Sequence, residues 1–143
     1  MKRPGVPAVG LNTVGQIGAT NQLVFHTGQN GRKIAVALLS TRTAGAPVVD
    51  PDGRYLGFIN ESDLMRALAE GKDLNNLIAE DLMTIGPTAV HSSTTIEDAA
   101  KRMEEQCVQN LPVEHDGRVA YSVTRHDLLL AWVWLGLGMG FDP

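Results

Sequence analysis

The chain has 143 residues, of which 43% are apolar, and its 16 Asp and Glu outnumber 12 Lys and Arg to give a formal net charge of −4 at pH 7. This composition excludes disordered and collagen-like chains, and the length suits one compact unit of the usual roughly 100–200 residues. The negative charge also argues against a nucleic-acid binder held by a general basic field. Because Cys107 is the only cysteine, no internal disulfide can form, and we expect a reducing, cytoplasmic location.

Two stretches of the sequence bear on whether the chain has a targeting or membrane-spanning segment. Prolines and glycines interrupt residues 1–18, which does not fit a signal peptide. The most apolar stretch, LLLAWVWLGLGMGF over 128–141, is shorter than the roughly 20 residues that cross a bilayer. We therefore expect a soluble protein with no transmembrane segment.

Taken in chain order, the first half predicts a strand near 22–26, a helix near 32–42, strands near 46–50 and 55–60, and a helix near 61–70. In the second half a strand ending at His91 precedes SSTTIEDAAKRMEEQ, which reads as a helix with a capping box from Thr94 to Glu97. LPVEHDGRVAYSV then predicts strand, Asp-Gly turn and strand. TRHDLLLAWVWL predicts a second helix with Asp127 in its first turn, where a carboxylate suits the helix dipole.

The two halves are copies of one unit. Asp52-Gly53-Arg54 recurs as Asp116-Gly117-Arg118, and Asp63-Leu64 recurs as Asp127-Leu128 at the same spacing. A fixed offset inside a matching order of elements indicates an internal duplication. The sequence therefore divides into an extension over 1–13, a first repeat over 14–70, a linker over 71–78, a second repeat over 79–135 and an apolar glycine-rich tail over 136–143.

The segments AGAPVVDPDGRYLGFINESDL and VQNLPVEHDGRVAYSVTRHDL, with AEDLMTIGPTAVHSSTTIEDAAKRM leading into the second, resemble a tandem CBS-domain pair, also called a Bateman module. The resemblance implies an α+β fold in which two βαββα repeats pack about a pseudo-twofold axis. It also implies two clefts between the repeats that bind adenine nucleotides. The family pattern at the last strand of a repeat is Gly-apolar-apolar-Thr/Ser-x-x-Asp.

Carried over by position, the resemblance makes Thr124 the phosphate-side hydroxyl and Asp127 the ribose carboxylate of one cleft, with Arg125 and His126 as charge partners. A strand-to-helix corner with a hydroxyl and free N–H groups suits a phosphate. The opposite repeat would complete this adenine pocket with Asn21, Leu23, Thr43, Ala44 and Gly45.

In the other cleft the equivalent residues are Asn60 and Asp63, with Ser62 beside the carboxylate. The opposite repeat would contribute Thr88, Val108, Gln109 and Asn110. The chain departs from the family pattern at Asn60, where Thr or Ser is usual, at Tyr121, which replaces Gly, and at Ser122, which replaces an aliphatic residue. Tyr121 could stack on a base or fill the cleft. We therefore expect nucleotide to bind more tightly at Asp127.

Other reactive side chains are interpreted as structural. His26 and His91 occupy equivalent strand ends without a nearby cysteine or paired carboxylate, so no metal site is predicted. Cys107 lacks a base partner and is interpreted as a small buried side chain. No catalytic constellation is present, so we expect no enzyme activity and no cofactor, with adenine nucleotide as a ligand only.

The function predicted is a stand-alone regulatory module that senses an adenine-containing ligand and signals to an unidentified protein. AMP, ADP, ATP, NAD and S-adenosylmethionine are all candidates. The alternative is an interaction or oligomerisation protein with degenerate, empty clefts. A homodimer is also expected, because residues 128–135 are all apolar and Trp132 and Trp134 are favoured interface anchors. Otherwise one tryptophan packs inside its own module.

Overall fold

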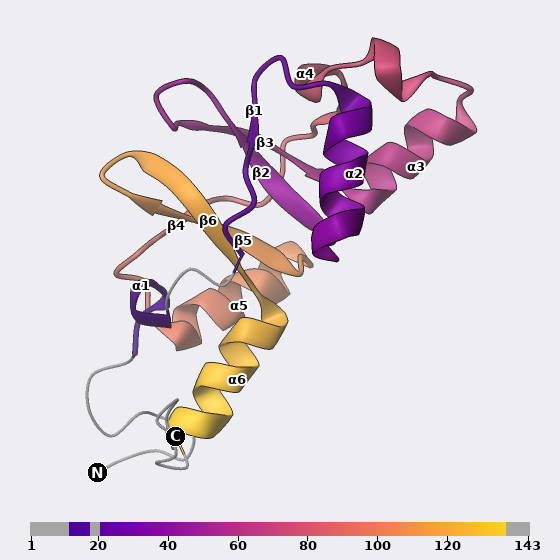
Figure 1. The fold of residues 1–143 in the computed structure, drawn as a ribbon. Helices are drawn as coiled ribbons and strands as arrows, with labels where there is room; N and C mark the ends of the chain where they lie inside the picture. The colour runs from indigo at the N-terminus through magenta and orange to yellow at the C-terminus, as the bar shows by residue number, and fades with distance from the viewer. Residues whose placement is uncertain (1–11, 18–20, 137–143) are drawn as a thin grey trace.

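The computed structural model describes residues 12–17 and 21–136, the last three of these without their side chains. The chain forms two units that stand next to each other (Figure 1). The elements of the first half are α1 (Val14–Ile17), β1 (Phe25–His26), α2 (Gly31–Thr41), β2 (Gly45–Val49), β3 (Tyr55–Asn60) and α3 (Glu61–Ala69). Those that follow are the 3₁₀ turn η1 (Leu74–Asn76), α4 (Ala79–Leu82), β4 (Val90–His91), α5 (Ile96–Gln106), β5 (Asn110–His115), β6 (Arg118–Thr124) and α6 (Arg125–Gly136).

Each unit contains a three-stranded sheet with the same topology. β1 runs parallel to β2, which pairs antiparallel with β3, and β4, β5 and β6 repeat this arrangement. The pairing register shifts after Val48 in one unit and after Val113, its repeat equivalent, in the other. The duplicated βαββα order and the α+β class predicted from the sequence are therefore confirmed.

The two cores have exchanged one short helix each. Val14 of α1 is fully buried in the core of the second unit, and the Val14 N–H donates to the Thr94 carbonyl at 2.9 Å. Ala79 and Leu82 of α4 are buried in the core of the first unit, and the Ala79 N–H donates to the Gln29 carbonyl at 2.9 Å. The helix that begins each repeat thus packs on the opposite repeat, which ties the two units together (Figure 1).

Backbone hydrogen bonds also join the two hairpins. The Val119 N–H donates to the Gly53 carbonyl at 2.8 Å, and the Ser122 N–H donates to the Asn21 carbonyl at 3.0 Å. These bonds fix the turn of one hairpin and the segment before β1 against β6. They hold the two units together in the pseudo-twofold arrangement.

Local sequence explains the element boundaries, with one correction. α5 begins one residue later than expected: Thr95 is the N-cap, and its hydroxyl accepts from the Asp98 N–H at 3.0 Å, in place of a Thr94–Glu97 capping box. Asp116 and Gly117 both have positive φ, at 53° and 77°, as a two-residue type I′ hairpin requires. In the part of the chain that the structure describes, no helix is long and apolar enough to cross a membrane.

Candidate functional site

Helices α3 and α6, which occupy equivalent positions in the two repeats, each begin in a reciprocal capping box. The Thr124 N–H donates to Asp127 Oδ2 at 2.8 Å, and the Asp127 N–H donates to Thr124 Oγ1 at 3.1 Å. In the first unit the Asn60 N–H donates to Asp63 Oδ2 at 2.8 Å, and the Asp63 N–H donates to Asn60 Oδ1 at 3.0 Å. The Asn60 amide thus replaces a hydroxyl in this corner without changing its geometry.

Two clefts open at these corners, each built from both units. The larger, about 620 Å³, is called the Asp127 cleft; its lining residues are Asn21, Thr41, Arg42, Thr43, Ala44, Gln109, Asn110, Thr124, Arg125, His126, Asp127 and Leu129. The smaller, about 320 Å³, is called the Asn60 cleft; its lining residues are Ala44, Phe58, Asn60, Glu61, Ser62, Pro87, Cys107, Val108, Gln109 and Asn110. Both volumes suit small-molecule ligands.

The Asp127 cleft brings together most of the residues expected there. Thr124, Arg125, His126 and Asp127 line it from the second unit, and Asn21, Thr43 and Ala44 line it from the first. Leu23 does not reach the cleft and packs against the core of the first unit. Gly45 is buried at the start of β2, where an added Cβ would meet the Phe58 ring at 2.6 Å.

Arg42 is a lining residue of this cleft that sequence reasoning missed. It ends α2 in the left-handed conformation, with φ 54°, and its backbone N–H bonds the last turn of the helix. With Arg125 it gives the cleft a cationic lining near the carboxylate of Asp127. This arrangement favours a ligand that carries both an anionic group and hydroxyl donors.

The Asn60 cleft differs more from expectation. Asn60, Ser62, Val108, Gln109 and Asn110 line it as predicted, whereas Thr88 and Asp63 do not. Phe58, Glu61, Pro87 and Cys107, together with Ala44 from the list for the other cleft, are the lining residues that sequence reasoning did not place there.

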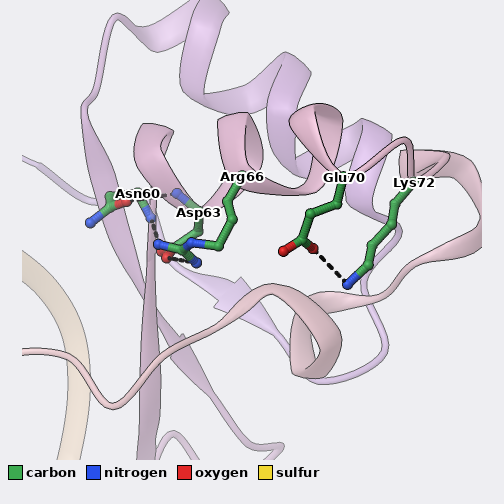
Figure 2. A network of polar contacts seen from close by, with 5 residues as sticks. All are labelled: Asn60, Asp63, Arg66, Glu70 and Lys72. Carbon is green, nitrogen blue, oxygen red and sulfur yellow. Dashed lines mark hydrogen bonds and ion pairs between the residues drawn. The ribbon is translucent and has the colours of Figure 1, made fainter.

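Asp63 is withdrawn from the Asn60 cleft by an ion pair. Its side chain is 3% exposed, and Asp63 Oδ1 accepts from Arg66 Nη1 at 3.2 Å while Oδ2 accepts from the Asn60 N–H (Figure 2). Both carboxylate oxygens are therefore bonded within the first unit. Thr88 is not a lining residue of this cleft, and its backbone N–H donates to Gln106 Oε1 at 2.9 Å.

The carboxamide of Asn110 lies at the wall that the two clefts share. The residue is 7% exposed, and its Nδ2 is buried without a hydrogen-bond partner among the described residues. Buried polar groups are paired in the large majority of cases, so an unpaired donor here needs an explanation. Asn110 lines both clefts, but a ligand in either would reach this buried nitrogen only after the side chain rotated.

The departures at Tyr121 and Ser122 have a structural role in the second unit. Tyr121 is half-buried against the core of this unit and is not among the lining residues of either cleft; burial raises the pKa of its phenol above the ordinary value. The Ser122 hydroxyl is fully buried and accepts from Asn21 Nδ2 at 2.9 Å. The Asn21 amide is thus used to join the units at the edge of the Asp127 cleft.

The expectation for Cys107 is wrong, because its side chain is exposed. Cys107 ends α5 in the left-handed conformation, with φ 54°, and it lines the Asn60 cleft.

Among the described residues, no group of three or more His, Cys, Asp or Glu could hold a metal ion. His91 Nδ1 bonds the Ser93 hydroxyl at 2.7 Å.

Comparisons with known proteins agree with this architecture. The CBS domain family model matches residues 14–70 and 79–133. CBS domain-containing protein CBSX1, chloroplastic, from Arabidopsis thaliana is 26% identical over 92% of this chain and 68% of its own length. Arabinose 5-phosphate isomerase KdsD from Pseudomonas aeruginosa is 29% identical over 77% of this chain, which spans 37% of that enzyme.

Two solved structures with bound ligands are similar to this chain. CBSX2 in complex with AMP has a TM-score of 0.69 and 27% identity, with 84% of this chain and 95% of that chain covered. The CBS domain pair of protein MJ0100, in complex with 5′-methylthioadenosine and S-adenosyl-L-methionine, has a TM-score of 0.70 and 26% identity, with 81% and 95% covered.

Proposed function

Since this chain belongs to the CBS-domain family as a tandem pair, we propose that it is a regulatory module that senses an adenine nucleotide in the Asp127 cleft. The observation that carries the proposal is the meeting of Thr124 and Asp127 with the cations Arg42 and Arg125 in one cleft made by both units. Relatives that bind AMP, 5′-methylthioadenosine and S-adenosylmethionine support the class of ligand.

Each lining group has a distinct proposed role. The Asp127 carboxylate accepts from the ribose hydroxyls, for which a charge-assisted bond is the strong kind. The Thr124 hydroxyl and the guanidinium groups of Arg42 and Arg125 face the phosphate, and His126 adds a further charge when it is protonated. The α6 N-terminus places its positive dipole end on the same side.

Signalling would follow from the position of the cleft between the units. A ligand that touches Arg42 of the first unit and Arg125 of the second favours the arrangement in which both reach it. It can shift the protein only by its differential affinity for two arrangements. A regulated partner protein that distinguishes these arrangements would transmit the signal, and we propose the cytoplasm as the place where this occurs.

A non-catalytic role is proposed for this chain. The Asp127 carboxylate that lines its cleft is already engaged by the Thr124 N–H, and the carboxylate of Asp63 is held by Arg66. Neither cleft shows a nucleophile activated by a neighbouring base among the described residues. The enzyme name of KdsD belongs to a protein of which this chain spans 37%.

A second candidate function is self-association, alone or together with sensing. A largely apolar groove of about 650 Å³ runs between α5 and α6, lined by Ile96, Ala100, Met103, Leu128, Leu129 and Trp132 among others. Leu129 is 63% and Val133 48% exposed, and apolar surface of this kind marks an interaction site. Trp132 is half-buried, while the side chain of Trp134 lies outside the described part of the chain.

Calorimetric titration with AMP at two salt concentrations tests the sensing proposal. Contacts from Arg42 and Arg125 to a phosphate predict that AMP affinity falls as salt rises from 50 to about 300 mM, because salt screens exposed charges. Adenosine, which has no phosphate, should show no such dependence. An AMP affinity that is insensitive to salt would show that the arginines do not contact the ligand. If neither AMP nor adenosine gives any heat of binding, the self-association candidate is favoured over sensing.

A further inference from the structure

The two clefts are built from equivalent positions of the two repeats, and the charges at these positions differ. The Asp127 cleft combines the end of α2 with the strand-to-helix corner that begins α6. The Asn60 cleft combines the end of α5 with the corner that begins α3. Arg42 and Cys107 are the equivalent helix ends, both with φ 54°. Glu61 and Arg125 are the equivalent first residues of α3 and α6.

At three equivalent positions, a basic residue in the Asp127 cleft is replaced by a neutral or acidic residue in the Asn60 cleft. Arg42 in the Asp127 cleft corresponds to Cys107 in the Asn60 cleft, Arg125 corresponds to Glu61, and His126 corresponds to Ser62. Among the described residues that line the Asn60 cleft there is no Arg, Lys or His, and Glu61 is the one charged side chain. The cationic lining of one cleft is therefore replaced by a neutral to anionic lining in the other.

Resting on the proposed function, we infer that the Asn60 cleft binds an uncharged or cationic nucleoside and rejects the phosphorylated ligand of the Asp127 cleft. Glu61 stands in the first turn of α3, where the dipole would otherwise attract an anion. A phosphate there would face a carboxylate without a lining cation, and like charges in a partly desolvated site repel strongly. A nucleoside without phosphate, or one with a positive group near Glu61, avoids this repulsion.

The size and walls of the Asn60 cleft fit the same class of ligand. Its volume is about 320 Å³, against about 620 Å³ for the Asp127 cleft. Phe58, Pro87 and Val108 provide apolar surface for a flat base, and Tyr55 Oη fixes the Pro87 carbonyl at 2.7 Å.

The ribose hydroxyls would find different partners here than in the Asp127 cleft. Asp63 does not line the Asn60 cleft, because its carboxylate is bonded to Arg66 and to the Asn60 N–H. The Ser62 hydroxyl and the Glu61 carboxylate are the acceptors that remain at this corner. The Asn60 cleft therefore recognises its ligand with neutral and anionic groups throughout.

Cys107 allows occupancy of this cleft to be measured separately. It is the only cysteine of the chain, it is exposed, and it lines the Asn60 cleft but not the Asp127 cleft. Alkylation with N-ethylmaleimide, followed by intact mass spectrometry, gives the rate at which Cys107 reacts. At nine-tenths occupancy only the free tenth of the protein reacts, so a bound ligand slows alkylation about tenfold.

The expected result is that adenosine slows alkylation of Cys107, whereas AMP at a concentration that saturates the Asp127 cleft leaves the rate within about twofold of the free protein. The variant Asp127→Ala, titrated in the same way, removes any effect transmitted from AMP in the neighbouring cleft. Glu61→Arg introduces the residue found at the equivalent position of the second unit, and there AMP should protect Cys107. Glu61→Gln, a matched variant without the added cation, should give weaker protection.

Two results would overturn the inference. One is that AMP protects Cys107 of the unmodified chain as well as adenosine does. The other is that neither ligand protects Cys107 while calorimetry shows AMP bound in an Asp127-dependent manner. If AMP produces no Asp127-dependent binding but adenosine still protects Cys107, the proposed function fails and the assignment of the Asn60 cleft survives. The comparison in the unmodified chain decides the inference even if Glu61→Arg does not fold.

Discussion

Arg66 Nη1 lies 3.2 Å from Asp63 Oδ1, and Leu130, which cannot form such a bond, occupies the position equivalent to Arg66 in the second unit. Figure 2 shows the pair beside the Asn60 cap of α3. It gives the equivalent aspartates of the two repeats different surroundings. Asp63 serves the fold of the first unit, while Asp127 lines a cleft.

We expect Arg66→Leu to lower the free energy of unfolding by about 1 kcal/mol, because a hydrogen bond to the charged, nearly buried Asp63 is lost. Such bonds contribute about 1.5–3 kcal/mol, and the half-exposed Arg66 calls for a smaller figure. Urea denaturation measures the change. Lys72→Leu is the matched control, since the Lys72–Glu70 pair is about half exposed on both sides and should contribute close to zero. Equal effects of the two variants would contradict the structural role of Asp63.

The Asn60 cap predicts a different pattern of stability. Asn60→Ala removes the acceptor for the Asp63 N–H and should cost about 1 kcal/mol, whereas Asn60→Thr keeps an acceptor and should cost only a few tenths. Thermal unfolding should therefore rank the chain, Asn60→Thr and Asn60→Ala in that order. If Asn60→Thr were as unstable as Asn60→Ala, the amide would be needed for more than capping.

Tyr55 should make stability depend on pH in the alkaline range. Burial raises the pKa of its phenol above the ordinary value of about 10, because the charged form is desolvated. The folded state therefore favours the protonated form, so the stabilisation is complete below pH 10 and is lost as pH rises toward the folded pKa. Between pH 8 and about pH 10.5 the chain should lose more stability than Tyr55→Phe does.

The hydroxyl of Tyr55 also donates to the Pro87 carbonyl at 2.7 Å, so Tyr55→Phe should itself cost about 1 kcal/mol at pH 8. Urea unfolding of both proteins at the two pH values measures both effects. Tyr121, which is retained in the variant, provides the same background in each. Parallel losses of stability in the two proteins would show that Tyr55 does not titrate differently in the folded state.

The groove between α5 and α6 predicts self-association. If it is an interface, Leu129→Glu should convert a dimer to a monomer by placing a charge on an apolar contact surface. Light scattering measures the mass. Leu56→Glu is the control, because Leu56 is an exposed leucine on β3 outside the groove. A chain that is monomeric without any substitution, or a dimer that tolerates Leu129→Glu, would contradict this interface.

The repeat made most of the fold predictable. Turn residues such as Asp116-Gly117 predict the hairpins, and the spacing of four between Ile34 and Leu38 predicts the buried face of a helix. The exchange of α1 and α4 between the cores was not predictable, since each helix has four residues and buries only one or two apolar side chains, too few to indicate the unit against which they pack. Residues 1–11 of the extension predicted over 1–13, and residues 137–143 of the tail predicted over 136–143, lie outside the described residues.

The candidate site was predictable where it follows the repeat and unpredictable where side chains compete. Arg42 could have been found from the repeat. It is equivalent to Cys107, which directly precedes the predicted site residues 108–110. The loss of Asp63 from its cleft depends on Arg66, a residue one helical turn away that carries no motif. The burial of Cys107 was misjudged because cysteine is most often buried, whereas here it ends α5 in the left-handed conformation with its side chain exposed.

The affinity of AMP for Asp127→Ala, measured by calorimetry beside the unsubstituted chain, tests the central claim most directly. Loss of a charge-assisted bond to the ribose should weaken binding about tenfold or more, equivalent to about 1.5–3 kcal/mol. Asp98→Ala is the matched control, since Asp98 is also a first-turn aspartate but is not among the lining residues of either cleft, and it should bind AMP unchanged. An unchanged affinity in folded Asp127→Ala, or an equal loss in Asp98→Ala, would contradict nucleotide sensing at the Asp127 cleft.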